Sequence, residues 1–415
     1  MTLRHPTLLI LLTGSLAFIL TCAALVHAET ITLVVWDYGD NPDWWQWVQG
    51  NFEARYPHIK LELHGRGNPD RLIAASAGGV APDVFYSSIA WGRDLFDKGL
   101  LRDLSSYIAQ STQLDLNEWI PVTRVYSQKD GRPFGIPFKM SSAAIVYNKS
   151  HFREAGLDDA PTGLRTWDEL LDAARKLTRS DGERITRSGF RPSNNLEAFS
   201  AWLYSNGGTF YTEDLRAANF DTPAGRQTLD LIKELFRSGH VFSPEAGDFV
   251  GATASMQYWG TWAERDLAAS GLDAGMTNFP PGPLGERRAT ATWSNMYTIP
   301  TGAKNPDAAW RYIEFVTSLE AQIAFSEIYD DPGVPRFAYF HSDSFRARVA
   351  RNPYMEYVPY IYESGGAYPY LRYTEVNSEV GPLLQAATSA NASIPVEEAL
   401  TRMREIVDRH LRELN

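Results

Sequence analysis

The alternation of strand and helix signals near the start of the chain limits the possible fold more than any other feature of the sequence. Apolar runs typical of strands occupy residues 31–36, 59–64 and 83–86. Helical stretches separate these three runs, so the order is β-α-β-α-β. This order predicts an open α/β sheet with helices packed on its faces.

Several helices are predicted from their start signals. The first begins at Asn41-Pro42, because proline is favoured in the first helical turn, and it places Trp45, Val48 and Phe52 on one face. Four more start signals are Thr166 with Glu169, Thr222-Pro223, Asn305-Pro306 and Pro395.

Length, charge and cysteine content narrow the class of protein. A chain of 415 residues predicts two or three domains rather than one. The net charge of −11 argues against a nucleic-acid partner, which would need a basic face to meet phosphate. The single cysteine, Cys22, excludes a disulfide framework and any cysteine-based metal cluster.

Residues 1–28 have the features of a secretory signal peptide. Arg4 precedes an apolar run over 8–26, and residues 26–28 form a small-residue cleavage site. Two alternatives stay open: a retained membrane anchor, because the run is just long enough to span a bilayer, and lipidation at Cys22. Cleavage after residue 28 would leave no cysteine in the mature chain, whose core must then be stable without disulfide bonds.

The chain carries no recognised catalytic motif. Its histidines beyond the leader are scattered without metal-ligand spacing, and both the nucleophile-elbow and the phosphate-loop patterns are absent. Asp37 and Asp40 could form a glycosidase carboxylate pair, which needs about 5 to 9 Å of separation, but structural roles for these two residues are the stronger interpretation. We therefore expect no metal or cofactor, and a binding protein is favoured over an enzyme.

A set of short motifs in a constant order resembles the family 1 extracellular solute-binding proteins, the relatives of maltose-binding protein that serve ABC importers. In segment 135–178 the matching elements are Gly135-Ile-Pro137, Tyr147-Asn148-Lys149, Phe152, Ala155-Gly156-Leu157 and Thr166-Trp167-Asp168-Glu169-Leu170. Elsewhere they are Ala81-Pro82-Asp83-Val84, Gly99-Leu100-Leu101, Asn206-Gly207-Gly208, Met256 with Gly260-Thr261-Trp262, Asn305-Pro306-Asp307-Ala308-Ala309-Trp310, Ile313-Glu314-Phe315 and Gly333-Val334-Pro335. The resemblance covers residues 31–411.

The resemblance implies an α/β, two-lobed periplasmic-binding-protein-like fold with a ligand cleft between the lobes, which closes by hinge motion. The hinge crossings are expected near 136–141, 289–296 and 330–336. In that arrangement 1–28 is the signal peptide, 29–137 and 293–332 form lobe I, and 138–292 and 333–415 form lobe II.

The function that the resemblance implies is capture of a sugar or oligosaccharide by a monomeric periplasmic protein, which delivers it to the permease subunits of an ABC importer. Such a protein uses no cofactor and performs no catalysis. The same fold could instead bind a polyol, a phosphorylated polyol, an amino compound or an anionic sugar, with Lys139, Arg66 or Arg372 supplying the positive charge. A secreted glycoside-acting enzyme is a third hypothesis.

A sugar needs polar partners for its hydroxyls and aromatic faces for its C–H patches. Trp262 is the strongest candidate, because Gly260-Thr-Trp262 resembles the motif whose tryptophan stacks on sugar in the family, although a core role is the alternative. The other predicted ligand contacts are Asp40, Asn41, Ser87, Ser88, Trp91, Ser141, Asn195, Glu197, Trp293, Tyr368, Tyr370 and Tyr373.

Some of these residues have competing roles. Asn41 could simply cap its helix, and which of the three late tyrosines meets ligand stays open. Asp83 is expected to fix the backbone in place rather than to contact the ligand. Of the 12 tryptophans, Trp167, Trp202 and Trp310 are expected in the core, Trp262, Trp293 and Trp91 in a sugar-stacking set, and Trp44 and Trp47 either in packing or at the cleft mouth.

Overall fold

The computed structural model describes residues 30–237 and 241–414. The predicted signal peptide, with its cleavage site after Ala28 and the alternative lipidation site Cys22, lies outside the described residues. In the part of the chain that is described, none of the helices combines the length and apolar character needed to cross a membrane.

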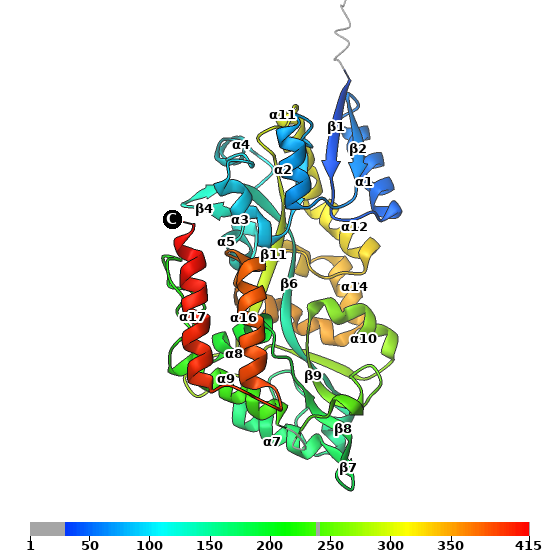
Figure 1. Ribbon diagram of the computed structural model, residues 1–415. Helices are drawn as coiled ribbons and strands as arrows, with labels where there is room; N and C mark the ends of the chain where they lie inside the picture. Colours follow the sequence, from blue (N-terminus) through cyan, green and yellow to red (C-terminus); the bar gives the residue numbers. More distant parts are fainter. Residues whose placement is uncertain (1–29, 238–240, 415) are drawn as a thin grey trace, which may run out of the picture.

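One mixed sheet runs through the molecule in the order β2-β1-β3-β11-β6-β9-β8-β7, with β10 paired to β6 and β12 paired to β11 (Figure 1). Its strands are β1 (Ile31–Trp36), β2 (Ile59–His64), β3 (Val84–Ser87), β6 (Gly135–Asn148), β7 (Arg179–Asp181), β8 (Arg184–Arg191), β9 (Ala254–Gly260), β10 (Ala274–Thr277), β11 (Thr290–Thr298) and β12 (Gly365–Ala367). A separate hairpin joins β4 (Gln128–Lys129) to β5 (Arg132–Pro133).

The first three strands are parallel and form the centre of one lobe, as the β-α-β-α-β order predicts. The helices and short turns of the first third of the chain are α1 (Pro42–Arg55), α2 (Pro69–Ala77), α3 (Ile89–Asp97), α4 (Ser105–Gln110), η1 (Leu116–Glu118) and α5 (Pro121–Val125). Two later helices, α11 (Pro306–Val316) and α12 (Leu319–Tyr329), return to this lobe and share its core with β1, β3 and α1. Asp83 holds backbone as expected, since its carboxylate accepts from the amides of Val34 and Asn305.

The inward face of α1 differs by one residue from the sequence prediction. Trp44, Val48 and Phe52 are fully buried, whereas Trp45 is only partly buried. The indole N–H of Trp44 donates to Asp37 at the end of β1, 3.0 Å away, and its ring stacks on Trp47. Trp44 and Trp47 therefore serve packing. Trp45 also packs against this core, as the sequence predicts, but Trp44 is the tryptophan that is fully buried.

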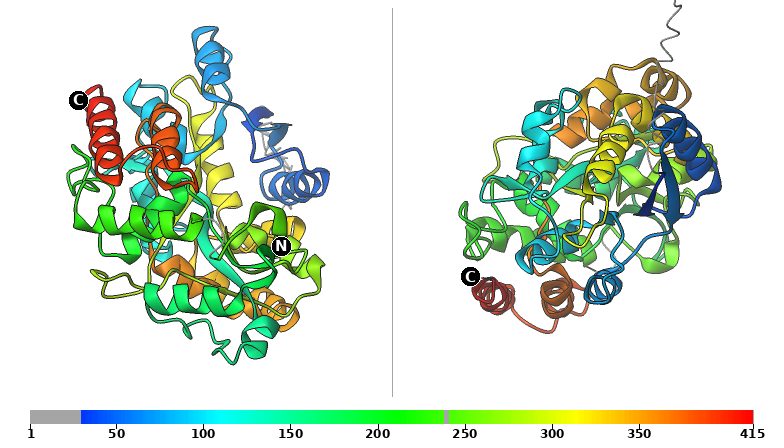
Figure 2. Two further views of the ribbon diagram at one scale, coloured as in Figure 1. Left: turned by 60° about the horizontal axis from the view of Figure 1, so that its bottom comes forward. Right: turned by 90° about the horizontal axis from the view of Figure 1, so that it is seen from above.

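The second lobe is built on the other end of the sheet. Its helices and turns are α6 (Lys149–Glu154), α7 (Trp167–Leu177), α8 (Leu196–Ser205), α9 (Pro223–Phe236), η2 (Pro244–Ala246), η3 (Thr261–Ala263), α10 (Glu264–Ser270), α13 (Phe337–Phe340), α14 (Asp343–Arg351), η4 (Pro353–Tyr357), α15 (Val358–Glu363), α16 (Tyr373–Thr388) and α17 (Val396–Arg412). Figure 2 shows α16 and α17 side by side along one side of the molecule. The helix starts predicted at Thr166, Thr222-Pro223, Asn305-Pro306 and Pro395 are confirmed.

Alternate residues of β6 face two different cores. Ala143 and Ile145 belong to the core covered by α7, α8, α9 and α16, and Ala144 and Val146 to the core beneath α10 and α13–α15. The expected core tryptophans Trp167, Trp202 and Trp310 are all buried. Since successive strand residues point to opposite faces, one strand can serve both layers.

The long strands β6 and β11 connect the two lobes. Gly135–Ser142 of β6 pairs with β11, and Ala143–Asn148 pairs with β9 and β10. A third segment, 330–336, crosses beside them, and the amide of Met140 donates to the carbonyl of Gly333 at 2.8 Å. The predicted boundaries 137/138 and 292/293 fall inside the two long strands, and the boundary 332/333 falls in the third segment; all three stay predictions.

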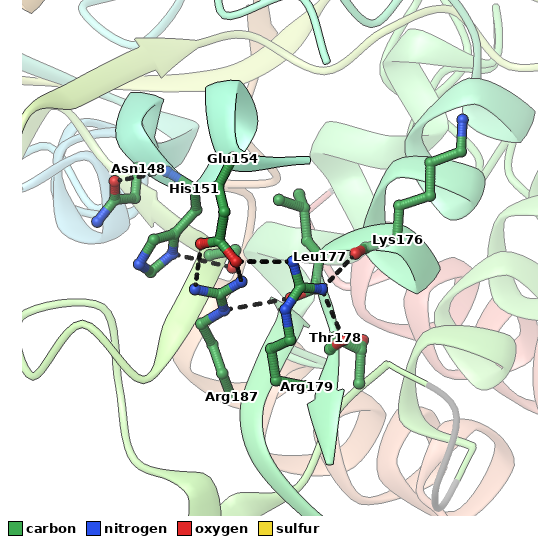
Figure 3. A network of polar contacts seen from close by, with 9 residues as sticks. Asn148, His151, Glu154, Lys176, Leu177, Thr178, Arg179 and Arg187 are labelled. Atoms are coloured by element: carbon green, nitrogen blue, oxygen red, sulfur yellow. Dashed lines mark hydrogen bonds and ion pairs between the residues drawn. The ribbon is translucent and has the colours of Figure 1, made fainter. Parts of the chain in front are cut away.

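A polar network on the outer surface of the second lobe fastens the β7–β8 hairpin to α6 (Figure 3). Glu154 accepts from Arg179 at 2.9 Å and from Arg187 at 3.0 Å, and these two guanidinium groups lower the pKa of Glu154 to about 2. His151 on the same helix contacts Ser255 at 3.0 Å. These charged residues therefore have a structural role, and they lie away from the residues between the lobes.

Candidate functional site

The side chains between the lobes start from one face of the paired strands β6 and β11. Trp293 lies opposite Ser141 and Asn295 lies opposite Lys139, so all four project from the same face. Trp293 and Asn295 are partly exposed, whereas Ser294 on the opposite face is buried. A bulge between Asn295 and Met296 ends this alternation. We call the first face the interlobe face.

Four of the predicted ligand contacts form a continuous row of rings on this face, which we call the aromatic row. Trp262 and Trp293 have ring centroids 5.2 Å apart, Trp293 and Tyr368 are 5.8 Å apart, and Tyr368 and Tyr373 are 5.5 Å apart. The rings come from three segments far apart in the chain. Their tilted arrangement leaves Trp262 39% exposed, so it offers an open face at one end of the row.

The position of Trp262 depends on the glycine that precedes it. β9 ends at Gly260, and a Cβ atom at that position would lie 1.8 Å from the indole ring of Trp262. Only glycine allows the ring to fold back over the strand. Thr261 fixes the turn further, because its hydroxyl accepts from the amide of Ser142 at 3.1 Å. The Gly-Thr-Trp motif is thus a structural unit that presents an aromatic face.

Glu197 is a predicted contact whose side chain is partly buried. Glu197 occupies the first turn of α8, and its only hydrogen bond among the described residues is a 3.4 Å contact from Asn195. Burial withdraws the carboxylate from water and raises the pKa of Glu197 to about 7. Burial also raises the pKa values of Tyr258 and Tyr368, to which the charge of Glu197 contributes. The carboxylate of Glu197 can therefore accept further hydrogen bonds.

The other side of the interlobe region carries charged residues at the carboxyl ends of parallel strands, where open α/β sheets bind ligands. The loops after β1 and β2 enclose a pocket of about 420 Å³, lined by Gly39, Asp40, His64, Gly65, Arg66 and Arg71. The Arg66 guanidinium lies 5.2 Å from the ring centre of Tyr38 and 5.3 Å from that of Tyr86. The predicted contact Asp40 belongs to this pocket rather than to the aromatic row.

The three cations proposed for an anionic ligand differ in their surroundings. Lys139 forms an ion pair with Asp331 of the third crossing segment. Arg372 pairs with Glu375 at 3.2 Å and with Glu413 at 3.4 Å. Within the described residues only Arg66 of these three has no carboxylate partner.

Several of the predicted ligand contacts have structural roles. The side chains of Asn41, Ser88 and Asn195 accept from backbone amides at the starts of α1, α3 and α8. Ser87 is fully buried, and Tyr370 is 2% exposed with its ring against Tyr126. Ser87 and Tyr370 therefore have almost no open surface, and the same holds for Tyr368 of the aromatic row, which is 4% exposed.

Two other predicted contacts lie at the margins of the row. Trp91 is partly buried and packs against the same hydrophobic core as Trp293, but among the described residues no ring contact joins it to the row. Ser141 is 7% exposed, beneath Trp293.

Two tyrosines that sequence reasoning missed complete the site. The hydroxyl of Tyr126 donates to the carbonyl of Thr292 and accepts from the amide of Tyr368. It therefore holds the backbone beside Trp293 close to the backbone of Tyr368. The buried hydroxyl of Tyr258 has no hydrogen-bond partner in the described structure. Tyr258 could have been found from its place two residues before Gly260, on the same strand face, whereas the contacts of Tyr126 are too distant in sequence to leave a signal.

The described structure argues against a carboxylate pair at Asp37 and Asp40. Asp37 is fully buried, and its oxygens accept from Trp44, Tyr297 and its neighbour Tyr38. It therefore presents no carboxylate to a sugar. Among the described residues no group of three or more His, Cys, Asp or Glu side chains is placed to hold a metal ion.

Comparison with known proteins is consistent with this arrangement. A maltotriose-binding protein of Pyrococcus abyssi is 23% identical over 308 residues, which cover 68% of this chain and 64% of that protein. An sn-glycerol-3-phosphate-binding periplasmic protein of Shigella dysenteriae is 26% identical over 200 residues, 45% of this chain and 45% of that protein. The chain thus spans less than two thirds of the length of each of these two relatives.

A solved structure and a family model complete the comparison. The cyclic α-maltosyl-1,6-maltose binding protein of Arthrobacter globiformis superposes with a TM-score of 0.79 at 22% identity, over 93% of this chain and 100% of that one. This likeness shows the two-lobed α/β fold that the sequence predicts. The model of the bacterial extracellular solute-binding proteins matches residues 38–323. Because that match covers more than half of the chain, the protein belongs to the bacterial extracellular solute-binding protein family.

Proposed function

We propose that this protein captures a carbohydrate between its two lobes and delivers it to the permease of an ABC importer. The observation that carries the proposal is the aromatic row, whose rings come from three separate segments. Aromatic faces bind the C–H patches of a sugar, and a carboxylate accepts from its hydroxyls. A maltotriose-binding relative and a structural neighbour that binds a cyclic maltosyl-maltose support the same ligand class.

The capture step needs only reversible closure of the lobes. β6, β11 and segment 330–336 are the connections about which the lobes rotate. Closure brings the pocket around Asp40 and Arg66 over the aromatic row, so that polar groups of one lobe and rings of the other enclose the solute. No bond of the solute is broken in this cycle, and we propose that the protein has no catalytic activity.

Export to the periplasm as a monomer fits this role. The apolar leader at 8–26 supplies the export signal, and the family to which the chain belongs acts outside the cytoplasm. Mass measurement of the exported protein tests the cleavage site after Ala28, because retention or lipidation at Cys22 gives different masses. Light scattering of the purified protein tests the monomeric state.

A phosphorylated polyol is the second candidate solute. Arg66, without a carboxylate partner in the described structure, is the observation that favours it, together with the relative that binds sn-glycerol 3-phosphate. An arginine in a pocket can form paired hydrogen bonds with phosphate oxygens. This solute would occupy the pocket at the ends of β1 and β2 rather than the aromatic row.

One titration distinguishes the candidates. The purified mature protein is titrated with neutral sugars, oligosaccharides, polyols and phosphate esters while its tryptophan fluorescence is followed. A saturating change with an unmodified sugar supports the proposal, and a response to phosphate esters alone favours the second candidate. Absence of any response to carbohydrate would overturn the first, and release of a cleaved product would contradict a pure binding role.

A further inference from the structure

Two arginines line the pocket at the carboxyl ends of β1 and β2. Arg66 and Arg71 are both exposed there, and among the described residues neither forms an ion pair with a carboxylate, although Asp40 lines the same pocket. His64, which also lines it, contacts Glu62 at 2.8 Å. The pocket therefore holds two cations that have no anionic partner in the described structure.

Aromatic rings position both guanidinium groups. The guanidinium of Arg66 lies 5.2 Å from the ring centre of Tyr38 and 5.3 Å from that of Tyr86, and that of Arg71 lies 4.1 Å from the ring centre of Trp36. Ring faces attract cations electrostatically at such distances. No acceptor among the described residues takes a hydrogen bond from either guanidinium group, so their N–H donors are available to a ligand.

The short segment between the two arginines is fixed by its own contacts. Gly67 is buried, and a Cβ atom at that position would lie 2.3 Å from the ring of Trp36, so only glycine fits there. The side chain of Asn68 accepts from the amide of Arg71 at 2.8 Å and begins α2. The fold itself therefore brings Arg66 and Arg71 together at the strand ends, where open α/β sheets bind ligands.

The pocket borders the interlobe face. The ammonium group of Lys139, which projects from that face, lies 5.5 Å from the centre of the same Tyr38 ring that Arg66 contacts. Lys139 is paired with Asp331, so its charge is already balanced. In the closure proposed above, the pocket comes over the aromatic row, and one solute then contacts both.

The charges that line the pocket match a singly charged anion. Two guanidinium groups and the carboxylate of Asp40 leave a net charge of +1. A sugar carboxylate carries one negative charge and accepts paired hydrogen bonds from arginine, whereas a phosphate monoester carries about −1.5 to −2 near pH 7. The carboxylate is therefore the better match, and Asp40 can accept from the hydroxyls of the same sugar.

We infer that the solute is a uronic acid or an oligosaccharide that contains one, bound with its carboxylate at Arg66 and Arg71 and its ring faces on the aromatic row. This inference rests on the proposed carbohydrate-binding function and names the class of sugar. It differs from the phosphorylated polyol in its anion and in its use of the aromatic row.

The test compares sugars that differ at one substituent. Glucose with glucuronic acid, and galactose with galacturonic acid, are titrated at pH 7 by calorimetry as monosaccharides and as disaccharides. Glucose 6-phosphate and sn-glycerol 3-phosphate form the phosphate arm. We expect each acid to bind roughly tenfold more tightly than its neutral partner, because hydrogen bonds to charged groups are stronger, and more tightly than glucose 6-phosphate.

Three variants assign the preference to the two arginines. Arg66→Gln and Arg71→Gln each remove one cation, so each should lower the preference for the acids while neutral sugars bind as before. Arg132→Gln is the matched control, because Arg132 is also exposed with its guanidinium 5.3 Å from the ring centre of Phe96 but does not line this pocket. Thermal unfolding of all three variants checks that they fold.

The outcomes separate this inference from the proposed function. Neutral sugars that bind as tightly as the acids overturn the inference and leave carbohydrate capture intact. Tighter binding of glucose 6-phosphate than of glucuronic acid also overturns it, as does a preference for acids that survives both arginine substitutions. Failure of every sugar in the panel, neutral and acidic, overturns both, and a response to sn-glycerol 3-phosphate alone has the same meaning.

Discussion

The guanidinium of Arg348 and the carboxylate of Glu264 form an ion pair of 2.5 Å in which both side chains are almost fully buried, at 2% and 1% exposure. Arg348 also donates to Asp330 at 2.8 Å and to the carbonyl of Ser326 at 2.8 Å. Glu264 lies two residues after Trp262, and Asp330 begins the third crossing segment. The pair therefore braces the loop of the aromatic row against the connection between the lobes.

Replacing Arg348 by methionine should destabilise the protein strongly. The substitution leaves Glu264 buried without its partner, which costs about 3–5 kcal/mol in comparable cases. Urea unfolding measures the loss. The double variant Arg348→Met with Glu264→Gln should recover part of it, because the stranded charge is gone. A loss below about 1 kcal/mol in the single variant would contradict this account of the pair.

Trp262→Ala should weaken carbohydrate binding by roughly thirtyfold, since truncating a central aromatic contact costs about 2 kcal/mol. The stability of the protein should change little, because the side chain is 39% exposed. Isothermal titration calorimetry measures the affinity. Trp262→Phe is the control and should retain more of the binding because it keeps an aromatic face; unchanged affinity in Trp262→Ala would show that this ring does not stack on the solute.

Stability in the absence of ligand should depend on pH through Glu197. Burial raises its pKa from 4.5 to about 7. Between these values the folded protein retains a proton that the unfolded chain releases, so the free energy of unfolding falls as the pH rises through this window. Urea unfolding at pH 5 and pH 7.5 measures the slope. Glu197→Gln should show a smaller fall than the parent protein, and an equal fall in both would rule out a raised pKa at this position.

Tyr126→Phe should loosen the centre of the aromatic row. The change removes the hydroxyl that contacts the carbonyl of Thr292 and the amide of Tyr368, at a cost of about 1–3 kcal/mol for buried groups left with fewer partners. Sugar affinity should fall as well, because Tyr368 is less firmly placed. Tyr107→Phe, which loses an exposed hydrogen bond to Asp307, is the control in denaturation and titration. Equal effects of the two substitutions would argue against a positioning role for Tyr126.

The predicted elements that matched the structure depend on local rules. The strands at 31–36 and 59–64 were predicted with the observed bounds, and the third is observed at Val84–Ser87. Helix starts at Thr166 and Thr222 were found because a cap and its amide lie within a few residues of each other. Trp44 is buried more deeply than the predicted Trp45, which also packs against the core, because the Trp44 indole donates to Asp37, a contact that the apolar pattern does not contain.

The candidate site was only partly predictable. Trp262, Trp293, Tyr368 and Tyr373 were named from residue type and from the family resemblance, and in the structure their rings form one row. Their order in the row could not be read from the sequence, because it depends on the register of β11 against β6 and on where the C-terminal segment returns to β11.

The sequence by itself determined the α/β class, the main helix starts and the family, because these follow from patterns of neighbouring residues and from motifs in a constant order. Only the tertiary structure decided which aromatic side chains face the space between the lobes and which fill the core. The physical reason is that burial and strand register are set by contacts between distant segments. Tyr126 illustrates this, since its partners Thr292 and Tyr368 are 166 and 242 residues away.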